Sequence, residues 1–330
     1  MKKTAFGIIA LLVISCQLKN ETEFSLNGKT NGIENGTTLY LDIGNKTIDS
    51  TKVENNAFTF NTKLSNLPLQ VIIRKKDFSQ YRYLWVENNP MIFDASKTGF
   101  RNAIIIGSES ENLSFSLDQK IDTLPRNKRQ KMEIDFVKTN PKSIVSASIL
   151  SHYTTTWGKE KTKELFEQLS TENKNTEFGK EIARYIELNK NPKIGEQFVD
   201  FEIENINGKL KKLSDLNGKT ILLEFWASWC GPCRQENPKL VKTYKKFNPK
   251  GFEIFAVSLD EDKESWLKAI KKDNLNWEHL SDLKGSRNEA SLIYGVNEIP
   301  DNFLISKSGE IIGRNLRGEK LNQKLKKLLE

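Results

Sequence analysis

The chain contains only three cysteines and two histidines among its 330 residues, and this scarcity limits the chemistry that it can carry. A structural zinc site takes several Cys or His ligands in closely spaced pairs, and small disulfide scaffolds need many more cysteines. Glycine and proline are also scarce, at 19 and 9 residues, which excludes a collagen-like chain. The composition favours a packed globular protein, and we expect neither a bound metal nor a cofactor.

Long blocks of one charge are also missing. The formal net charge is +8, but basic and acidic residues are interspersed along most of the chain. Without a basic block, a helix-turn-helix pattern or a zinc-finger pattern, the sequence does not indicate nucleic-acid binding. Its 18 phenylalanines, seven tyrosines and six tryptophans argue against a disordered chain. At roughly 100–200 residues per domain, the length predicts two or three domains.

The apolar run near the N-terminus is too short to span a membrane. It extends from Ala5 to Ile14 after a basic start, and covers about half of the ~20 residues that a membrane-spanning helix needs. A basic start, a short apolar segment and a small residue before the break are typical of a secretory signal. We therefore expect a signal peptide at residues 1–15 and a tether at residues 16–23.

Cys16 directly follows this expected signal peptide. The sequence Val13-Ile14-Ser15-Cys16 resembles the lipobox of bacterial lipoproteins, in which the signal is cut before the cysteine and the thiol is acylated. The resemblance implies a lipid on Cys16. A plain signal peptide with an incidental cysteine is the alternative.

Residues 24–108 contain short alternating or apolar runs separated by Asn, Gly and Asp. Such a pattern predicts short strands in an antiparallel sandwich or a small barrel, with Asn27-Gly28 as one of the turns. The expected strands lie at 38–43, 57–61, 69–73, 83–86 and 103–106. This β-rich N-terminal domain has no His, no Cys and no catalytic pattern, so we expect a binding or spacing module.

Residues 109–190 mix charged and apolar residues at helical spacing, which predicts a helical connector. His152 lies near its centre, beside Tyr153. An isolated histidine in such a segment is more often a packed or surface residue than a ligand. From residue 191 to residue 330 strands and helices alternate, which predicts an α/β domain.

Cys230 and Cys233 carry the clearest chemical signal. They stand in Trp229-Cys230-Gly231-Pro232-Cys233, between an apolar strand at Thr220–Trp226 and an expected helix. At a helix start, free N–H groups and the helix dipole stabilise the Cys230 thiolate, which is the reactive form. Cys233 lies one turn further on, so it can displace a partner from Cys230 and close a disulfide. The chain has no second C-x-x-C, so a zinc site is disfavoured.

The segment from Leu223 to Pro238, which contains this motif, is similar to the active-site segment of TlpA/ResA-type thioredoxin-like proteins. The resemblance covers about residues 192–330. It implies a thioredoxin-like domain with a central mixed sheet flanked by helices, and thiol-disulfide oxidoreductase activity on a bacterial membrane, facing the periplasm or the exterior. The front half resembles the β-rich domain often joined to such modules in Bacteroidetes-type lipoproteins.

The same resemblance implies roles for several residues beside the cysteines. Pro300 matches the cis-proline of the family, and Ile299 would present its backbone to a substrate peptide. Glu224 takes the place of the buried acid of thioredoxins, unless it faces the surface. Glu236 matches an acid near the ResA active site, unless it is an ordinary acid in the first turn of the helix.

The residues around the cysteines favour reduction. Gly231-Pro232 resembles the dipeptide of reducing thioredoxins, whose potential is about −270 mV, and Trp229 is expected on the docking face. We therefore expect reduction of disulfides in exported proteins, with electrons from a membrane thiol-electron donor. The alternatives are a disulfide oxidase or isomerase of the same fold, a peroxidase, and a binding module with an auxiliary redox domain.

Overall fold

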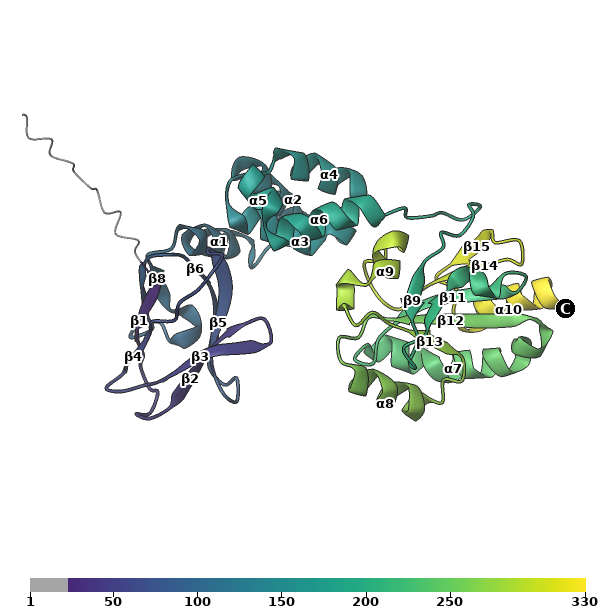
Figure 1. Ribbon diagram of the computed structural model, residues 1–330, viewed down its shortest axis with the longest axis horizontal. Coiled ribbons are helices and arrows are strands. Elements are labelled where there is room, and N and C mark those ends of the chain that lie inside the picture. The colour runs from purple at the N-terminus through teal and green to yellow at the C-terminus, as the bar shows by residue number, and fades with distance from the viewer. Residues whose placement is uncertain (1–22) are drawn as a thin grey trace, which may run out of the picture. The chain divides into compact units, whose positions relative to one another are not determined.

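A computed structural model describes residues 23–330 of the protein (Figure 1). The expected signal peptide, Cys16 and all but the last residue of the expected tether lie outside the described residues. The chain divides between Gln130 and Lys131, inside helix α2 (Arg126–Thr139), into two compact units. Within residues 23–330 no helix combines the length and the apolar composition needed to cross a bilayer.

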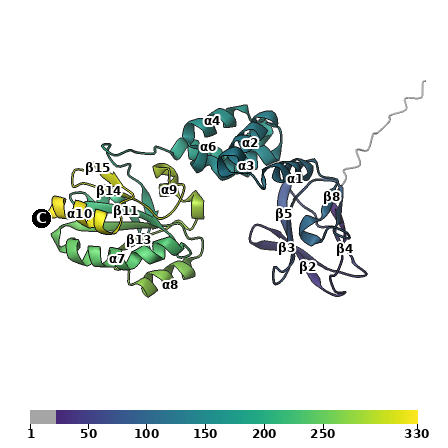
Figure 2. The same ribbon diagram turned by 180° about the vertical axis from the view of Figure 1, so that it is seen from behind.

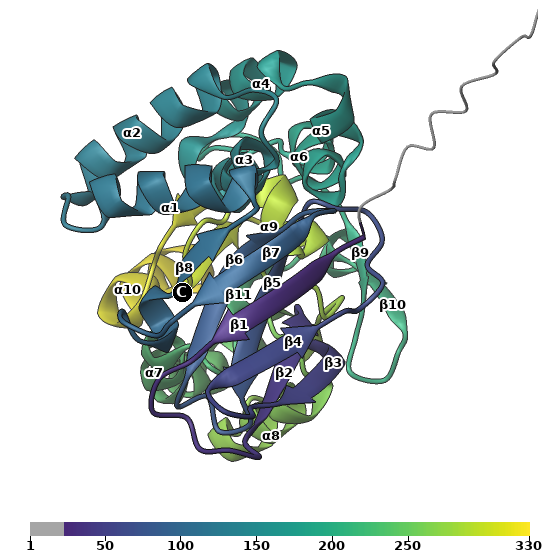
Figure 3. The same cartoon turned by 90° about the vertical axis from the view of Figure 1, so that its left-hand side faces the viewer.

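The first unit contains two four-stranded sheets that share one hydrophobic core. The strands are β1 (Ser25–Lys29), β2 (Thr38–Ile43), β3 (Lys46–Lys52), β4 (Ala57–Phe60), β5 (Leu69–Lys75), β6 (Tyr81–Val86), β7 (Pro90–Asp94) and β8 (Ile104–Ile106). One sheet has the order β4-β1-β7-β8 and the other β3-β2-β5-β6 (Figure 3). Alternate residues such as Leu26 in β1 and Leu41 in β2 point into the core and are fully buried. The prediction of a β-rich N-terminal domain is confirmed.

Two details of this domain differ from the prediction. Strand β1 runs parallel to β7, so the arrangement is not purely antiparallel. Asn27-Gly28 lies inside β1 and not in a turn, because Gly28 pairs with Phe58 of β4 and the Phe58 ring covers its Cα. A Cβ on Gly28 would lie 2.1 Å from that ring. Glycine at position 28 therefore allows the Phe58 ring to pack directly against the backbone of β1.

Helices occupy most of residues 109–188. They are α1 (Glu109–Ile121), α2, α3 (Ile144–Trp157), α4 (Lys159–Gln168), α5 (Thr171–Asn175) and α6 (Glu177–Leu188). Helix α1 belongs to the first unit, where Glu111 accepts hydrogen bonds from the Trp85 backbone and from Arg82. Exposed His152 packs its ring against Tyr153 in α3. All six helices lie where the sequence predicts a helical connector.

The last connector helix is bound to the C-terminal domain. The Asn189 amide, just after α6, donates to the Leu292 carbonyl of α9 (Glu289–Tyr294) at 2.8 Å. Arg287 pairs with Glu181 of α6 at 3.0 Å. Helix α6 and the C-terminal domain are therefore held together within the second unit.

The C-terminal domain is built on a five-stranded mixed sheet. Its order is β13-β12-β11-β14-β15, and β11, β12 and β13 are parallel while β14 and β15 are antiparallel neighbours. The strands are β11 (Thr220–Trp226), β12 (Phe252–Ser258), β13 (Glu278–Leu280), β14 (Asp301–Ile305) and β15 (Ile311–Arg314), and a separate hairpin contains β9 (Glu202–Glu204) and β10 (Leu210–Lys212). This arrangement confirms the predicted thioredoxin-like domain.

Helices cover both faces of this sheet. Helices α7 (Gly231–Phe247), α8 (Lys263–Asp273) and α10 (Gly318–Leu329) pack on one face, with α10 beside α7, and α9 packs on the other (Figures 1 and 2). Side chains alternate along β11, so Leu222, Glu224 and Trp226 share the face covered by α7 and α10. The central strand thus places one carboxyl group in the interior, beneath the helix that begins at the cysteines.

Candidate active site

The cysteine pair stands where the chain leaves the central strand and enters α7. Cys230 is the N-cap of α7, and its Sγ accepts a hydrogen bond from the Cys233 backbone N–H at 3.2 Å. The two cysteines form a disulfide, with their Cα atoms 5.3 Å apart. Pro232 occupies the first turn, where the N–H that proline lacks would have no helical partner. The helix start is therefore placed to stabilise a thiolate on Cys230 when the bond is reduced.

The surface around the disulfide is apolar and accessible. Trp229 is 67% exposed, whereas Trp226, three residues earlier, is only 1% exposed and belongs to the core. Gly231 and Pro232 are also exposed. Cys230 and Cys233 themselves are 4% and 1% exposed, so a partner must approach closely over Trp229 and Pro232 to reach the sulfur atoms.

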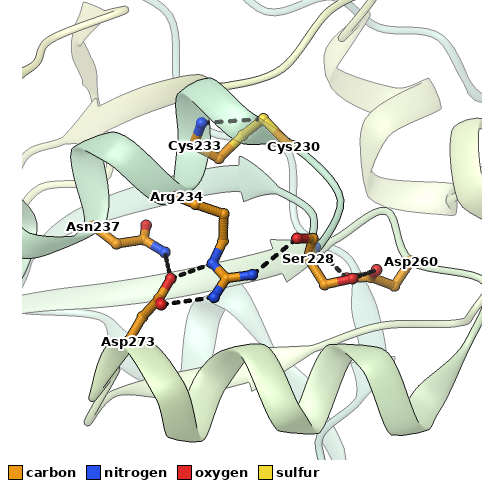
Figure 4. Close-up of polar contacts among 7 residues, drawn as sticks. All are labelled: Ser228, Cys230, Cys233, Arg234, Asn237, Asp260 and Asp273. Atoms are coloured by element: carbon orange, nitrogen blue, oxygen red, sulfur yellow. Dashed lines mark hydrogen bonds and ion pairs between the residues drawn. A yellow bond between two sulfur atoms is a disulfide. The ribbon is translucent and has the colours of Figure 1, made fainter.

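The loop before Cys230 is fixed by hydrogen bonds on both sides of Ser228 (Figure 4). The Asp260 carboxylate accepts from the Ser228 backbone N–H at 2.9 Å and from the Ser228 hydroxyl. The Arg234 Nη1 group donates to the Ser228 carbonyl at 3.0 Å. The backbone two residues before the nucleophile is therefore held by its donor and by its acceptor.

Arg234 is itself fixed by Asp273, the last residue of α8. Arg234 donates from Nη2 to Asp273 Oδ1 at 2.7 Å and from Nε to Oδ2, and Asn237 donates to Oδ2 at 2.7 Å (Figure 4). Burial alone would raise the pKa of Asp273, but the hydrogen bonds from Arg234 and Asn237 lower it below its usual value. The Arg234–Asp273 pair therefore connects the first turns of α7 to the end of α8, and Arg234 also binds the loop before Cys230.

Pro300 lies at the same edge of the sheet as the cysteines. Its peptide bond with Ile299 is cis, as the resemblance implied. Phe225 of β11 pairs with Asp301 of β14, so the next position in this antiparallel register places Pro300 beside Trp226. Asp301, which stands where the family often has threonine, is buried and paired with Arg314 at 2.6 Å. Its carboxylate is therefore engaged inside the domain.

Three of the residues predicted for the site, Glu224, Glu236 and Pro300, line one small cavity. Its lining includes Glu224, Glu236, Pro300, Asn302, Arg317 and Leu321. The room inside is about 10 Å³, roughly the space for one water molecule. The cavity therefore brings the buried acid of β11, an acid of α7 and the proline before β14 to one place.

Glu224 is the buried acid of this cavity. Glu224 is only 6% exposed, which contradicts the alternative that its side chain faces the surface. Burial, and after it the negative charge of Glu236, raises the pKa of Glu224 to about 8, while Arg317 acts in the opposite direction. This pKa is close to that of a free cysteine, about 8.5. A proton therefore has a similar affinity for the Glu224 carboxylate and for the thiolate of a free cysteine.

Glu236 lies at the mouth of the cavity and is not an isolated helix acid. The first turn of α7 contains no acidic residue, which rules out the alternative reading of Glu236 as a first-turn acid. Its Oε1 accepts from the Gly318 backbone N–H at 2.9 Å, and its Oε2 pairs with Lys239 at 3.0 Å. Its side chain is 19% exposed, so Glu236 contacts both the cavity and the solvent.

Sequence comparisons agree with this geometry. Residues 194–314 match a family model described as the AhpC/TSA family, and residues 24–113 match one described as a domain of unknown function, DUF4369. The thiol-disulfide oxidoreductase ResA of Bacillus cereus (strain ATCC 10987) is 32% identical over 146 residues, which cover 44% of this chain and 82% of the relative. The chain belongs to the ResA-type thiol-disulfide oxidoreductases. The enzyme therefore carries its activity in the C-terminal domain.

This ResA-type protein is also similar to a second relative and to a solved structure. ResA of Bacillus subtilis (strain 168) is 36% identical over 118 residues, which cover 36% of this chain and 64% of that relative. A solved C-terminal domain of a putative thiol-disulfide oxidoreductase from Bacteroides thetaiotaomicron is 36% identical, with a TM-score of 0.40, and covers 42% of this chain and 96% of that chain.

Several residues of the site were not found from the sequence. Asp260 and Arg234 contact the loop before Cys230, Asp273 holds Arg234, and Arg317 lines the cavity, yet none of them forms a local motif. Arg234 and Asp273 are 39 positions apart, and Gly318 and Glu236 are 82 positions apart. Only the packing of α7 against α8 and α10 brings these partners together.

Proposed function

We propose that this oxidoreductase reduces disulfides of exported proteins while a lipid on Cys16 attaches it to a bacterial membrane, facing the periplasm or the exterior. The observation that carries the proposal is the combination of the Cys230–Cys233 pair at a helix start with a buried acid, Glu224, behind it. The lipobox-like sequence at Cys16 and the short apolar segment before it support the location. A membrane thiol-electron donor would regenerate the dithiol.

The reaction transfers two electrons from the cysteine pair to the substrate. The Cys230 thiolate attacks one sulfur of the substrate disulfide, and the other sulfur leaves as a thiolate and takes up a proton. The Cys233 thiol then gives its proton to the Glu224 carboxylate. Its sulfur attacks Cys230 Sγ, the Cys230–Cys233 bond forms, and the mixed disulfide breaks to release the second substrate thiolate.

The charge balance at the helix start supports the reducing direction. Strongly oxidising proteins of this type stabilise their reduced form. Here the cation next to Cys233, Arg234, is neutralised by Asp273, so it adds little to the stabilisation of a Cys230 thiolate. The Gly231-Pro232 dipeptide supports the same direction.

The reduction potential of the Cys230–Cys233 pair tests the direction. Equilibration of the C-terminal cysteine pair with glutathione buffers should give a value near the −270 mV of thioredoxin, and a value near about −120 mV would establish an oxidase instead. Insulin reduction should be retained when residues 24–108 are deleted. Consumption of peroxide in the same assay would establish the peroxidase alternative.

The location has its own test. Cells fed an azide-labelled fatty acid should label the full chain, and Cys16→Ala should abolish the label and release the protein from the membrane fraction. An unlabelled wild-type chain would exclude the lipid anchor but not the reductase activity.

A further inference from the structure

The segment between β15 and α10 closes one side of the cavity and is held in a fixed position. The Asn302 side-chain amide donates to the Leu316 carbonyl at 3.0 Å and accepts from the Leu316 backbone N–H at 3.0 Å. Asn302 is buried in β14, next to Glu224 in the sheet register. The backbone that carries Arg317 is therefore attached to the strand that neighbours the buried acid.

Arg317 reaches from this segment to the proline loop. Its Nη2 group donates to the Pro300 carbonyl and to the Asn315 side-chain oxygen, the latter at 3.1 Å. The next residue, Gly318, donates its backbone N–H to Glu236 at 2.9 Å. Two consecutive residues thus contact the carbonyl of the cis-proline and the acid at the mouth of the cavity.

Arg317 is also the one cation among the charged residues of the described chain that line the cavity, and the other two are acids. The charged or titratable residues that line it are Glu224 from β11, Glu236 from α7 and Arg317 from the segment before α10. Lys239 pairs with Glu236 from the solvent side. The residues that β14 and α10 contribute to the lining, such as Asn302 and Leu321, carry no charge. Glu236 and Arg317 therefore act on Glu224 with opposite sign.

We propose that Arg317 is a positioning residue whose charge, anchored on the Pro300 carbonyl, sets the pH at which Glu224 exchanges its proton with Cys233. The inference rests on the proposed function for its role in turnover, because Glu224 accepts the Cys233 proton only during resolution of the mixed disulfide. A guanidinium that is fixed at the cavity favours the ionised form of Glu224. The Arg317 charge therefore keeps Glu224 ionised, and able to accept this proton, in a larger fraction of the molecules near neutral pH.

The direct test is the titration of Glu224, followed by NMR of the full chain with glutamate that is ¹³C-labelled at the side-chain carboxyl group. The Glu224 signal is assigned by its loss in Glu224→Gln. The wild-type midpoint is expected at about 8. Arg317→Gln should raise it by about one pH unit, because an opposite charge is removed, whereas Arg317→Lys should stay close to the wild type. Glu236→Gln should lower the midpoint, since it removes a like charge.

A matched control removes the same charge elsewhere. Lys327 is exposed on α10, and Lys327→Gln should leave the Glu224 midpoint unchanged. The rate of insulin reduction should follow the same pattern, with its pH profile displaced to higher pH only in Arg317→Gln. An unchanged Glu224 midpoint in a folded Arg317→Gln protein would overturn the proposal, and so would equal shifts in Arg317→Gln and Arg317→Lys. Absence of insulin reduction by the wild type would refute the proposed function alone, because the NMR titration does not depend on activity.

Discussion

The Arg234 guanidinium and the Asp273 carboxylate form a two-point contact that attaches the first turns of α7 to the end of α8. A third N–H of Arg234 donates to the Ser228 carbonyl, and Asp260 holds the N–H of the same residue. The position of the nucleophile is therefore determined by residues from three parts of the domain. The pair also keeps the charge of Arg234 from acting on Cys230 without compensation.

Loss of the Asp273 charge should affect both the stability and the thiol. We expect Asp273→Asn to lower the free energy of unfolding by about 1 to 3 kcal/mol, because a charged hydrogen-bond acceptor is lost. It should also raise the thiolate fraction of Cys230, because Arg234 then carries an uncompensated charge near the helix start. Urea unfolding and the rate of iodoacetamide alkylation of the reduced protein measure the two effects.

A matched control for this variant is Glu177→Gln. It removes one acid from the exposed Lys180–Glu177 pair of α6 and should change neither quantity appreciably. An alkylation rate in Asp273→Asn that equals the wild type would show that Arg234 does not act on Cys230 electrostatically.

We expect the two cysteines to have different roles: Cys230 attacks the substrate and Cys233 resolves the mixed disulfide. Cys230→Ser should abolish insulin reduction, since the sulfur at the helix start is lost. Cys233→Ser should accumulate mixed disulfides with substrate proteins, because the second displacement cannot occur. Non-reducing gels of protein extracts incubated with each reduced variant distinguish them. Trapped partners with Cys230→Ser and none with Cys233→Ser would reverse the assignment.

Glu224 should make the folded protein less stable as the pH rises. Its pKa is about 8 in the folded state and near 4.5 in a solvated chain. Below pH 4.5 both states hold the proton, whereas between 4.5 and 8 the unfolded state loses it and the folded state keeps it. The free energy of unfolding should therefore fall across this window by up to about 1.4 kcal/mol per pH unit.

Urea unfolding of the oxidised protein between pH 4 and pH 9 measures this slope. The difference between the wild type and Glu224→Gln isolates the contribution of the carboxyl group, because the amide does not titrate. Parallel stability curves for the two proteins would show that Glu224 ionises freely in the fold.

The ionisation of His279 should lower the stability of the folded protein at acidic pH. Burial lowers its pKa from 6.5 to about 4, so the unfolded chain takes up a proton below pH 6.5 while the folded chain does not. Stability should therefore decrease as the pH falls from 6.5 to 4. His279→Phe should remove this decrease. The His279 ring packs beside Trp226 and Trp277, and its single hydrogen bond, to the Leu275 carbonyl, is 3.3 Å long. Unfolding at pH 4.5 and pH 7 provides the comparison.

The sequence predicted the parts of this protein that depend on local pattern. The strand before Cys230 and the helix after it follow from a short stretch of chain, whereas the burial of Glu224 was implied only by the family resemblance and left the surface-facing alternative open. Gly28 was misinterpreted, because a glycine in a strand cannot be distinguished from a turn until its partner, Phe58, is known. Arg234 and Arg317 were missed for a related reason: their partners come from other elements, and one sequence contains no signal that pairs them.

Because Ser228 is bound through both its N–H and its carbonyl, the peptide units on either side of it cannot rotate without breaking one of these bonds. We expect the backbone of this loop to keep one shape whether the sulfur atoms are joined or separate. A partner would then meet nearly the same surface before and after electron transfer. Its departure would be governed by the exchange of the covalent bond and not by a change in the form of the enzyme.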